Sequence, residues 1–158
     1  MKGQRILITG GSGFVGIAIL RLFVERHEDW TLTVADVHPP DTDYAAEKGI
    51  EYVRTDVRIA QQCMQVVKAA RPTLIIHAAG RVPGGLTRYG RKGRDALFAL
   101  NVDGTKNMLD AARQCGVPNF ISTGSCTSIT DDLDHNYPNF TEDVPYPPKS
   151  LIYGESKV

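Results

Sequence analysis

The stretch Thr9–Gly16, with the sequence TGGSGFVG, lies between a short apolar run and an apolar helical pattern. The run before it, Arg5–Thr9 (RILIT), is predicted to be a strand that the glycine cluster stops. After it, the apolar spacing of Phe14–Arg26 predicts a largely buried helix. A helix that begins directly after such a loop offers free N–H groups and partial positive charge to phosphates. The stretch therefore predicts a strand, a phosphate-binding loop and a helix in succession.

Three glycines of this loop have separate physical roles. Gly10 can make the tight turn that leaves the strand, and Gly13 has no side chain to keep a pyrophosphate away from the backbone. Gly16 allows the helix to pack closely on the sheet. Asp36 follows Gly16 by 20 residues, at the end of a second predicted strand, Thr31–Asp36. A carboxylate there can accept both ribose hydroxyls and would repel a 2′-phosphate, which favours NAD over NADP. The alternative is an aspartate that caps a turn.

The rest of the chain continues the alternation of strands and helices. The apolar run Thr73–Ala79 is predicted to be a strand buried on both faces, and Arg94–Cys115 is predicted to be one long helix. The other predicted elements are a helix at Ile59–Ala70 and strands at Glu51–Arg54 and Asn119–Ser122. Strands separated by helices predict an α/β, Rossmann-type fold with a doubly wound parallel sheet of about five strands. A single domain is expected over residues 1–158.

Composition excludes several classes of function. The chain has 158 residues with 18 basic and 18 acidic side chains, and this balance argues against a nucleic-acid or anionic-membrane partner. Its three cysteines show no CxxC spacing, so neither a disulfide framework nor a metal site is expected. No apolar run approaches the roughly 20 residues of a membrane span, and no secretory signal is found at the N-terminus. We therefore expect a reduced, cytoplasmic compartment.

Four further motifs follow the glycine loop. They are Asp56-Val57, His77-Ala78-Ala79-Gly80, Asn101–Asn107 (NVDGTKN) and Tyr153–Lys157 (YGESK). Taken in order, the motifs resemble the extended short-chain dehydrogenase/reductase family, within the NAD-dependent epimerase/dehydratase superfamily. The most similar branch is that of the 3β-hydroxysteroid and sterol-4α-carboxylate 3-dehydrogenases. The resemblance implies an NAD-dependent enzyme that oxidises a secondary alcohol to a ketone by hydride transfer.

The resemblance also implies roles for individual residues. The catalytic group would be Ser125, Tyr153 and Lys157, with Ser122 as the alternative serine if the register shifts. The expected NAD-binding residues are Gly10, Gly13, Phe14, Val15, Gly16, Asp36, Asp56, Val57, Ala78, Ala79, Gly80, Asn101, Tyr153 and Lys157. For Asn101 the family role is structural, near the active site.

The chemistry of hydride transfer explains the residue types of the catalytic group. An alcohol must lose its hydroxyl proton, and a free phenol, with a pKa of about 10, is a poor base at neutral pH. A nearby ammonium group favours the phenolate. Tyr153 and Lys157 are four residues apart and share one face of a helix. Ser125 would hold the substrate oxygen and stabilise the charge that develops on it.

Several of these residues have plainer alternative interpretations. Asp56 could be a turn aspartate after a strand. His77 lies inside a predicted buried strand, so we interpret it as a core histidine that hydrogen bonds satisfy. The loop Arg81–Arg94 is rich in arginine and glycine. It is either a solvated surface loop or a loop that closes over an anionic group of cofactor or substrate.

Members of this family are about twice as long and add a smaller C-terminal substrate domain, whereas this sequence ends one residue after Lys157. The domain is therefore expected to be truncated at the helix of Tyr153 and Lys157, and that last turn is expected to fray. Two alternative functions stay open: isomerase-type chemistry without net redox change on a polycyclic natural product, or dinucleotide binding without turnover. The expected partner is a small, steroid-like or polycyclic substrate. An exposed edge at the fifth strand leaves a homodimer open.

Overall fold

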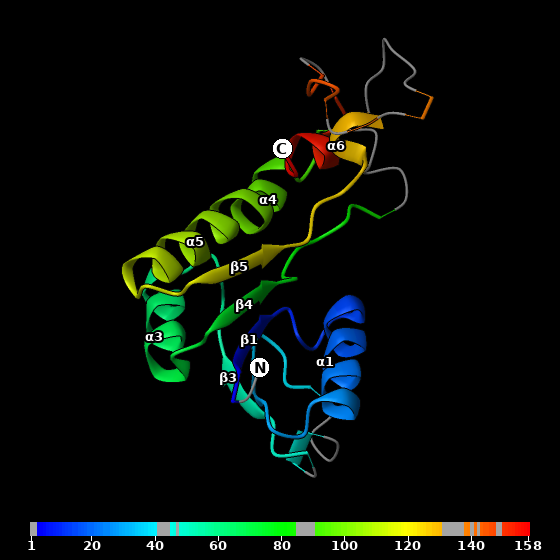
Figure 1. The fold of residues 1–158 in the computed structure, drawn as a ribbon. Helices are drawn as coiled ribbons and strands as arrows, with labels where there is room; N and C mark the ends of the chain where they lie inside the picture. The colour runs from blue at the N-terminus through cyan, green and yellow to red at the C-terminus, as the bar shows by residue number, and fades with distance from the viewer. Residues whose placement is uncertain are drawn as a thin grey trace. The chain divides into compact units, whose positions relative to one another are not determined.

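The computed structural model describes residues 3–40, 45–46, 48–84, 91–130, 138–139, 141, 143–147 and 150–158 (Figure 1). Its contacts divide the chain into two compact units. The first unit is Met1–Gly80 with Asp103–Thr123, and the second is Arg81–Val102 with Gly124–Val158. The first unit contains the sheet, and each unit is described by itself below.

The first unit is built on a five-stranded sheet in which every neighbouring pair of strands is parallel. The strands are β1 (Arg5–Thr9), β2 (Thr31–Asp36), β3 (Glu51–Arg54), β4 (Leu74–His77) and β5 (Asn119–Ser122). Their order in the sheet is β3-β2-β1-β4-β5. This order confirms the predicted Rossmann-type fold. It reverses between β1 and β4, where the carboxyl ends of the strands form the usual ligand-binding crevice.

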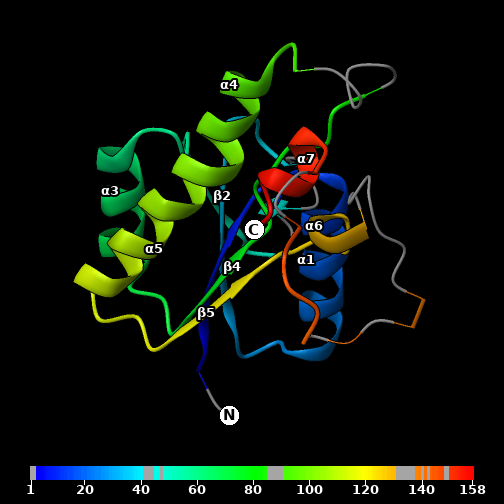
Figure 2. The same cartoon turned by 90° about the horizontal axis from the view of Figure 1, so that it is seen from above.

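Helices cover both faces of this sheet. Helix α1 (Phe14–Arg26) lies on one face, and α3 (Ala60–Ala70) and α5 (Gly104–Gln114) lie together on the other (Figure 2). The prediction of a largely buried α1 is wrong, because Gly16 and Leu20 are its only buried residues. The helix turns a narrow stripe toward the sheet, and its first residue, Phe14, is 95% exposed. The N-terminal turn of α1 is therefore open to a ligand.

Strand β4 is shorter than the predicted strand Thr73–Ala79. The Ala78 N–H still donates to Thr9 O at 3.0 Å, but β1 ends at Thr9. The next residue, Gly10, turns with a φ of +69° and donates its N–H to Ala35 O of β2 rather than to β4. Residues after Ala78 thus have no strand beside them on the β1 side. The chain leaves the sheet at the reversal point.

The imidazole of His77 joins three elements of the first unit. It is 1% exposed, with Nδ1 2.6 Å from Thr9 Oγ1 of β1 and Nε2 3.0 Å from Thr105 Oγ1 of α5. Both ring nitrogens therefore have a hydroxyl within hydrogen-bonding distance. This arrangement confirms the interpretation of His77 as a core histidine.

The three cysteines occupy different environments and form no disulfide. Cys63 on α3 is buried, with Sγ 3.3 Å from Val57 O, and burial raises the pKa of its thiol to about 11. Cys115 is half-buried, and Cys126 is exposed.

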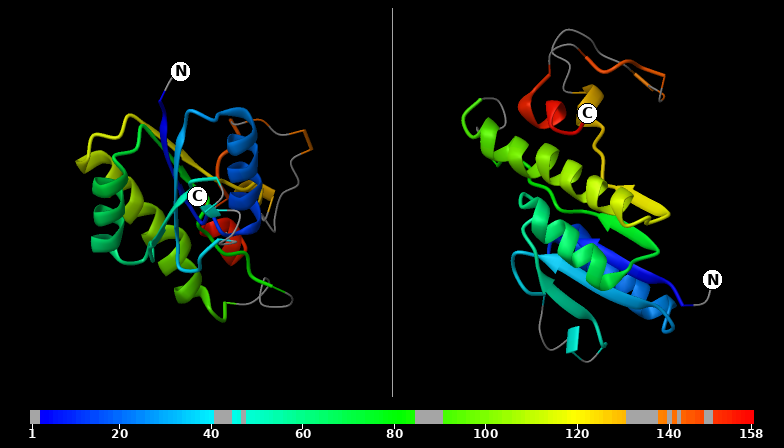
Figure 3. Two further views of the ribbon diagram at one scale, coloured as in Figure 1. Left: turned by 90° about the horizontal axis from the view of Figure 1, so that it is seen from below. Right: turned by 90° about the vertical axis from the view of Figure 1, so that its left-hand side faces the viewer.

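The predicted single helix Arg94–Cys115 consists of three helical segments that follow one another directly along the chain. Their ribbon is coloured green to yellow-green in Figure 3. They are α4 (Arg94–Phe98), the π-helical turn η2 (Ala99–Asp103) and α5. A π turn inserts an extra residue into the helical hydrogen-bond ladder and often marks a functional site. Here it carries Asn101, whose side chain is buried and bonds the main chain of Arg81.

The remaining helices of the second unit are α6 (Thr127–Thr130) and α7 (Ile152–Glu155), which pack against each other. Among the described residues, no helix has the length and apolarity that crossing a membrane requires.

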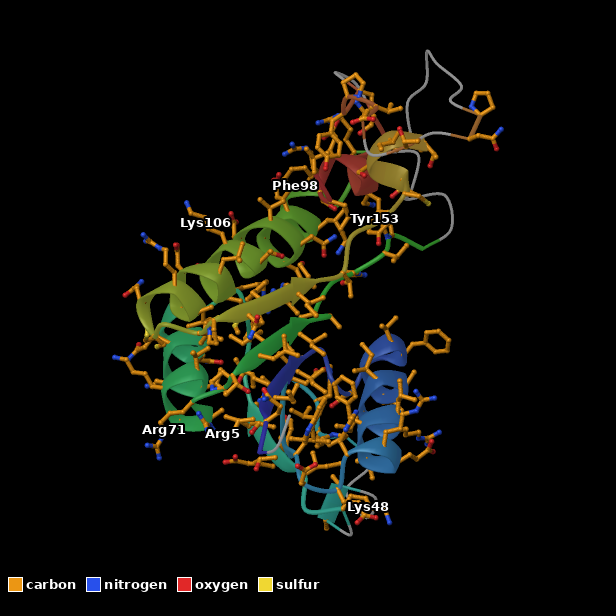
Figure 4. All side chains as sticks on the ribbon, viewed as in Figure 1. Arg5, Lys48, Arg71, Phe98, Lys106 and Tyr153 are labelled. Carbon is orange, nitrogen blue, oxygen red and sulfur yellow. The ribbon has the colours of Figure 1, made fainter. Side chains whose placement is uncertain are left out.

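Replacing His77 with leucine is expected to lower the free energy of unfolding by about 1–3 kcal/mol, because the hydroxyls of Thr9 and Thr105 lose the imidazole. Urea denaturation measures the change. Lys106→Ala is the control, since Lys106 is exposed on α5 (Figure 4). A His77→Leu protein as stable as this control would contradict the proposed role of the imidazole.

Candidate functional site

The backbone of the glycine loop packs too closely for side chains at two positions. A Cβ at Gly10 would lie 2.6 Å from the backbone nitrogen of Ala79, the residue that follows β4 by two. A Cβ at Gly16 would overlap the carbonyl oxygen of Gly10 itself. The close packing predicted between Gly16 and the sheet is instead packing against the loop that precedes the helix. These contacts fix the loop beside the reversal point of the sheet.

The N-terminus of α1 carries no neutralising group of its own. Its N-cap, Gly13, has no side chain to accept a hydrogen bond, and the first turn contains no acidic residue. Phe14 and Val15 in that turn are 95% and 49% exposed. The partial positive charge of a helix N-terminus and its free N–H groups are the features that bind a pyrophosphate. The residues present therefore fit the phosphates of a dinucleotide.

Asp36 is held beside this loop in a fixed orientation. Its Oδ2 accepts the Ser12 N–H at 3.2 Å and its Oδ1 accepts the His38 N–H at 3.1 Å. Each carboxylate oxygen has a second lone pair, so the group can still accept ribose hydroxyls. Sequence reasoning missed the part played by Ser12, although its place inside the glycine loop is a usable signal.

Asp56 and Val57 follow β3, next to the carboxyl end of β2. The Asp56 carboxylate accepts bonds from the Arg58 side chain, at 2.9 Å from Nε and 2.5 Å from Nη2, and from the Arg58 N–H at 3.0 Å. These side-chain hydrogen bonds hold the pKa of Asp56 below its usual value. Val57 is buried, and its carbonyl accepts Asn107 Nδ2 at 2.9 Å. The geometry is that of a turn aspartate, and an adenine contact stays a prediction.

The other predicted residues of the first unit follow β4. Ala78 and Ala79 are half-buried, and Gly80 is exposed. The backbone of Ala79 lies against Gly10. The predicted residues of this unit therefore all lie at the carboxyl ends of β1, β2, β3 and β4, where a parallel sheet binds its ligand.

The catalytic residues predicted from the resemblance belong to the second unit. Ser125 is half-buried just before α6, and its Oγ lies 2.8 Å from Thr127 Oγ1 and accepts the Thr127 N–H at 3.3 Å. The alternative, Ser122, is exposed on β5 in the first unit. Because α6 packs against α7, Ser125 and Tyr153 come from neighbouring segments.

Helix α7 carries Tyr153 (Figure 4). Lys157 follows one turn later, with its Nζ 6.0 Å from the centre of the Tyr153 ring. Both side chains are half-buried. Burial lowers the pKa of the Lys157 ammonium, since removal from water disfavours the charged form. The lysine is therefore placed to give up its proton more readily than an exposed lysine.

The expected fraying of this turn is not what the structure shows. Glu155 pairs with Arg91 at 3.4 Å and with Arg94 at 3.4 Å. Ile152, Gly154 and Ser156 are buried, so the turn presents an inner face to the rest of its unit. The expectation treated this turn as an isolated helix end with few hydrogen bonds, and so it did not include these tertiary contacts.

Two residues of the arginine-rich loop thus serve to anchor α7, and Arg88 lies outside the described residues. The described parts of the loop also border a cavity of about 260 Å³ in the second unit. The residues that line it include the basic Arg81 and Lys92 and the apolar Leu97 and Ile152. Ile152 directly precedes Tyr153, so the cavity adjoins the helix of the predicted base.

The model of a known family matches almost the whole chain. Residues 6–158 match the family described as "NAD dependent epimerase/dehydratase family". The chain belongs to this family. The predicted cofactor, NAD, is the cofactor of the epimerase/dehydratase family, and the predicted family resemblance is confirmed.

Two curated relatives act on steroids or sterols by name. The mouse sterol-4-alpha-carboxylate 3-dehydrogenase (decarboxylating) is 28% identical, over 99% of this chain and 39% of that protein. The 3-beta-hydroxysteroid dehydrogenase of Mycolicibacterium neoaurum is 31% identical, over 98% of this chain and 40% of that protein. The chain thus spans about two fifths of the length of these relatives.

Among solved structures of the epimerase/dehydratase fold, the UDP-glucose 4-epimerase of Thermus thermophilus in complex with NAD superposes with a TM-score of 0.75. It is 25% identical, and the match covers 97% of this chain and 47% of the epimerase.

Because the folded-state pKa of Asp56 is lowered, its pairing with Arg58 stabilises the fold at neutral pH and stops doing so as pH falls through that lowered value. Arg58→Ala is expected to return the pKa of Asp56 toward about 3.9, the value for a free side chain. NMR titration of the carboxyl group measures it. Arg113→Ala, which removes the partner of Asp110, is the control. An Asp56 titration unchanged by Arg58→Ala would refute the assignment.

Proposed function

We propose that the protein is an NAD-dependent oxidoreductase that oxidises a secondary alcohol to a ketone. The observation that carries the proposal is the anchored α7 turn, which places Tyr153 and the half-buried Lys157 together. Support for the cofactor comes from the uncapped N-terminus of α1 and from Asp36 beside the glycine loop. Family membership adds to both.

The reaction separates one hydride and one proton from the alcohol. Bound NAD supplies the hydride acceptor. In the proposed mechanism, the Tyr153 oxygen takes the hydroxyl proton, and the Lys157 ammonium favours the phenolate form that accepts it. The Ser125 hydroxyl donates a hydrogen bond to the substrate oxygen and stabilises charge there as the proton leaves. Lys157, whose pKa burial lowers, can pass a proton onward to solvent.

The proposed substrate is a small, largely apolar alcohol of the steroid or sterol kind. Its support is the names of the curated relatives, together with the cavity that Leu97 and Ile152 line. The cationic groups of Arg81 and Lys92 at the same cavity favour a substrate that also carries an anionic group.

A second candidate is dinucleotide binding without turnover. It requires only the uncapped N-terminus of α1 and the Asp36 carboxylate beside the glycine loop. Isomerase chemistry without net redox change is a further variant, since one mycobacterial relative is named a dehydrogenase/isomerase. A dehydrogenase reduces NAD as it turns over, whereas neither of these two alternatives produces reduced cofactor.

Calorimetric titration is expected to show tighter binding of NAD than of NADP, because the Asp36 carboxylate would repel a 2′-phosphate. Asp36→Ala is expected to weaken NAD binding by about tenfold or more through loss of hydrogen bonds to a charged group. Asp110→Ala, which changes a carboxylate on α5, serves as control. Equal affinities for both dinucleotides would contradict the role of Asp36, and no NAD binding would contradict the proposed function.

Tyr153→Phe and Ser125→Ala are each expected to lower kcat by about 100-fold or more, because one removes the base and the other removes the oxyanion donor. The assay follows the absorbance of the reduced cofactor with 3β-hydroxysteroids. Tyr146→Phe is the matched control, since Tyr146 is 57% exposed and has no proposed role. If Tyr153→Phe kept the rate of this control, Tyr153 would not be the base.

A further inference from the structure

Ser156 lies between Tyr153 of α7 and Lys157, the two proposed catalytic residues of this turn, and has no role so far. It is 3% exposed. Its hydroxyl donates to the carbonyl of Tyr153 at 2.8 Å and accepts a hydrogen bond from Asn101 Nδ2 at 2.9 Å. A buried hydroxyl with both a donor and an acceptor is fully used, and losing it leaves its partners unsatisfied.

Asn101 extends this contact to a third segment. Its Oδ1 accepts the Arg81 N–H at 2.8 Å, and its Nδ2 also donates to Arg81 O at 3.0 Å. An asparagine amide has one acceptor and two donors on a short stem, and all three are engaged here. The π turn η2 carries this amide. The pair therefore ties the catalytic turn to η2 and to the residue at which the chain enters the second unit.

The hydrogen bond between Ser156 and Asn101 restrains the segment from Tyr153 to Lys157, which sets the spacing of the two catalytic side chains. Ser156 holds the carbonyl of Tyr153 and is the direct neighbour of Lys157. The other anchor of this turn, Glu155 with Arg91 and Arg94, has longer contacts of 3.4–3.5 Å and a mostly exposed partner in Arg91. An exposed ion pair contributes less to placement than buried hydrogen bonds do. The buried contact is thus the stronger restraint on the turn.

We propose that Ser156 is a positioning residue that, through Asn101, holds Tyr153 and Lys157 in the register that proton transfer requires; the catalytic part of this inference rests on the proposed function. Catalytic groups must be held to within about half an ångström, and locked neighbours supply that restraint. Alanine at position 156 removes the bond to Asn101 and the bond to the Tyr153 carbonyl together.

The first test needs no activity. Hydrogen exchange on the full chain measures the amides of Glu155, Ser156 and Lys157, which bond within the α7 turn. Ser156→Ala is expected to raise their exchange rates at least fivefold, and Ser156→Thr, which keeps the hydroxyl, is expected to restore most of the protection. Ser150→Ala is the matched control, because the bond that the Ser150 hydroxyl makes among the described residues is local, to Leu151 O.

Asn101→Ala should raise the same exchange rates, and the effect of the double variant with Ser156→Ala should fall short of the sum of the two single effects, because both substitutions remove the shared bond between Asn101 and Ser156. Unchanged exchange in Ser156→Ala, or additive effects in the double variant, would overturn the pairing. The far-UV circular dichroism spectrum of each variant is expected to stay unchanged, which separates a local effect from loss of the fold.

The second test concerns catalysis. Ser156→Ala is expected to lower kcat at least tenfold with little change in the KM for NAD, and to move the acidic limb of the kcat–pH profile to higher pH. The shift is expected because a displaced Lys157 favours the phenolate less. A fall in kcat with an unmoved profile would overturn the positioning role. Failure of Tyr153→Phe to affect turnover would remove the proposed function, while the exchange result would still decide whether the tie exists.

Discussion

The first unit depends on a contact between two backbones from which side chains are excluded. At Gly10 and Gly16 the loop after β1 touches the chain after β4 and touches itself, at distances where any Cβ would collide. This contact brings the N-terminus of α1 to the carboxyl edge of the sheet. The same contact leaves the first turn of α1 uncapped and exposed. Fold and proposed phosphate site are therefore consequences of one packing constraint.

Much of this fold could be predicted because its local signals agree. The strands Arg5–Thr9, Thr31–Asp36 and Glu51–Arg54 have the predicted bounds, since apolar runs between glycine and proline breakers leave little freedom. The end of β4 depends on where its neighbour β1 stops. The residues of β4 themselves carry no signal for that position. The π turn at Asn101 likewise depends on hydrogen bonds to Arg81, a residue 20 positions away.

The candidate site also contains residues that could be predicted from the sequence and others that could not. Gly10, Gly16 and Asp36 could be located from spacing, because their roles depend on a strand, a turn and a helix in succession. The hydrogen-bonding partners of the site residues could not be located from spacing. Arg58 bonds Asp56 and Ser156 bonds Asn101 through side chains, and Ser12 bonds Asp36 through its backbone N–H. Only the folded chain defines these contacts. The expectation of a frayed catalytic turn failed for this reason, since Glu155 and Ser156 anchor it.

The burial of Cys63 has a chemical consequence. Thiol reagents attack the thiolate, and a thiol with a pKa of about 11 inside the first unit is almost entirely protonated at neutral pH. Cys126 is exposed to the same reagents without unfolding. Cys126 is therefore alkylated in the folded protein, whereas Cys63 is alkylated when the interface between α3 and the sheet opens. An alkylation time course on the unmodified protein would give the lifetime of that interface without any introduced label.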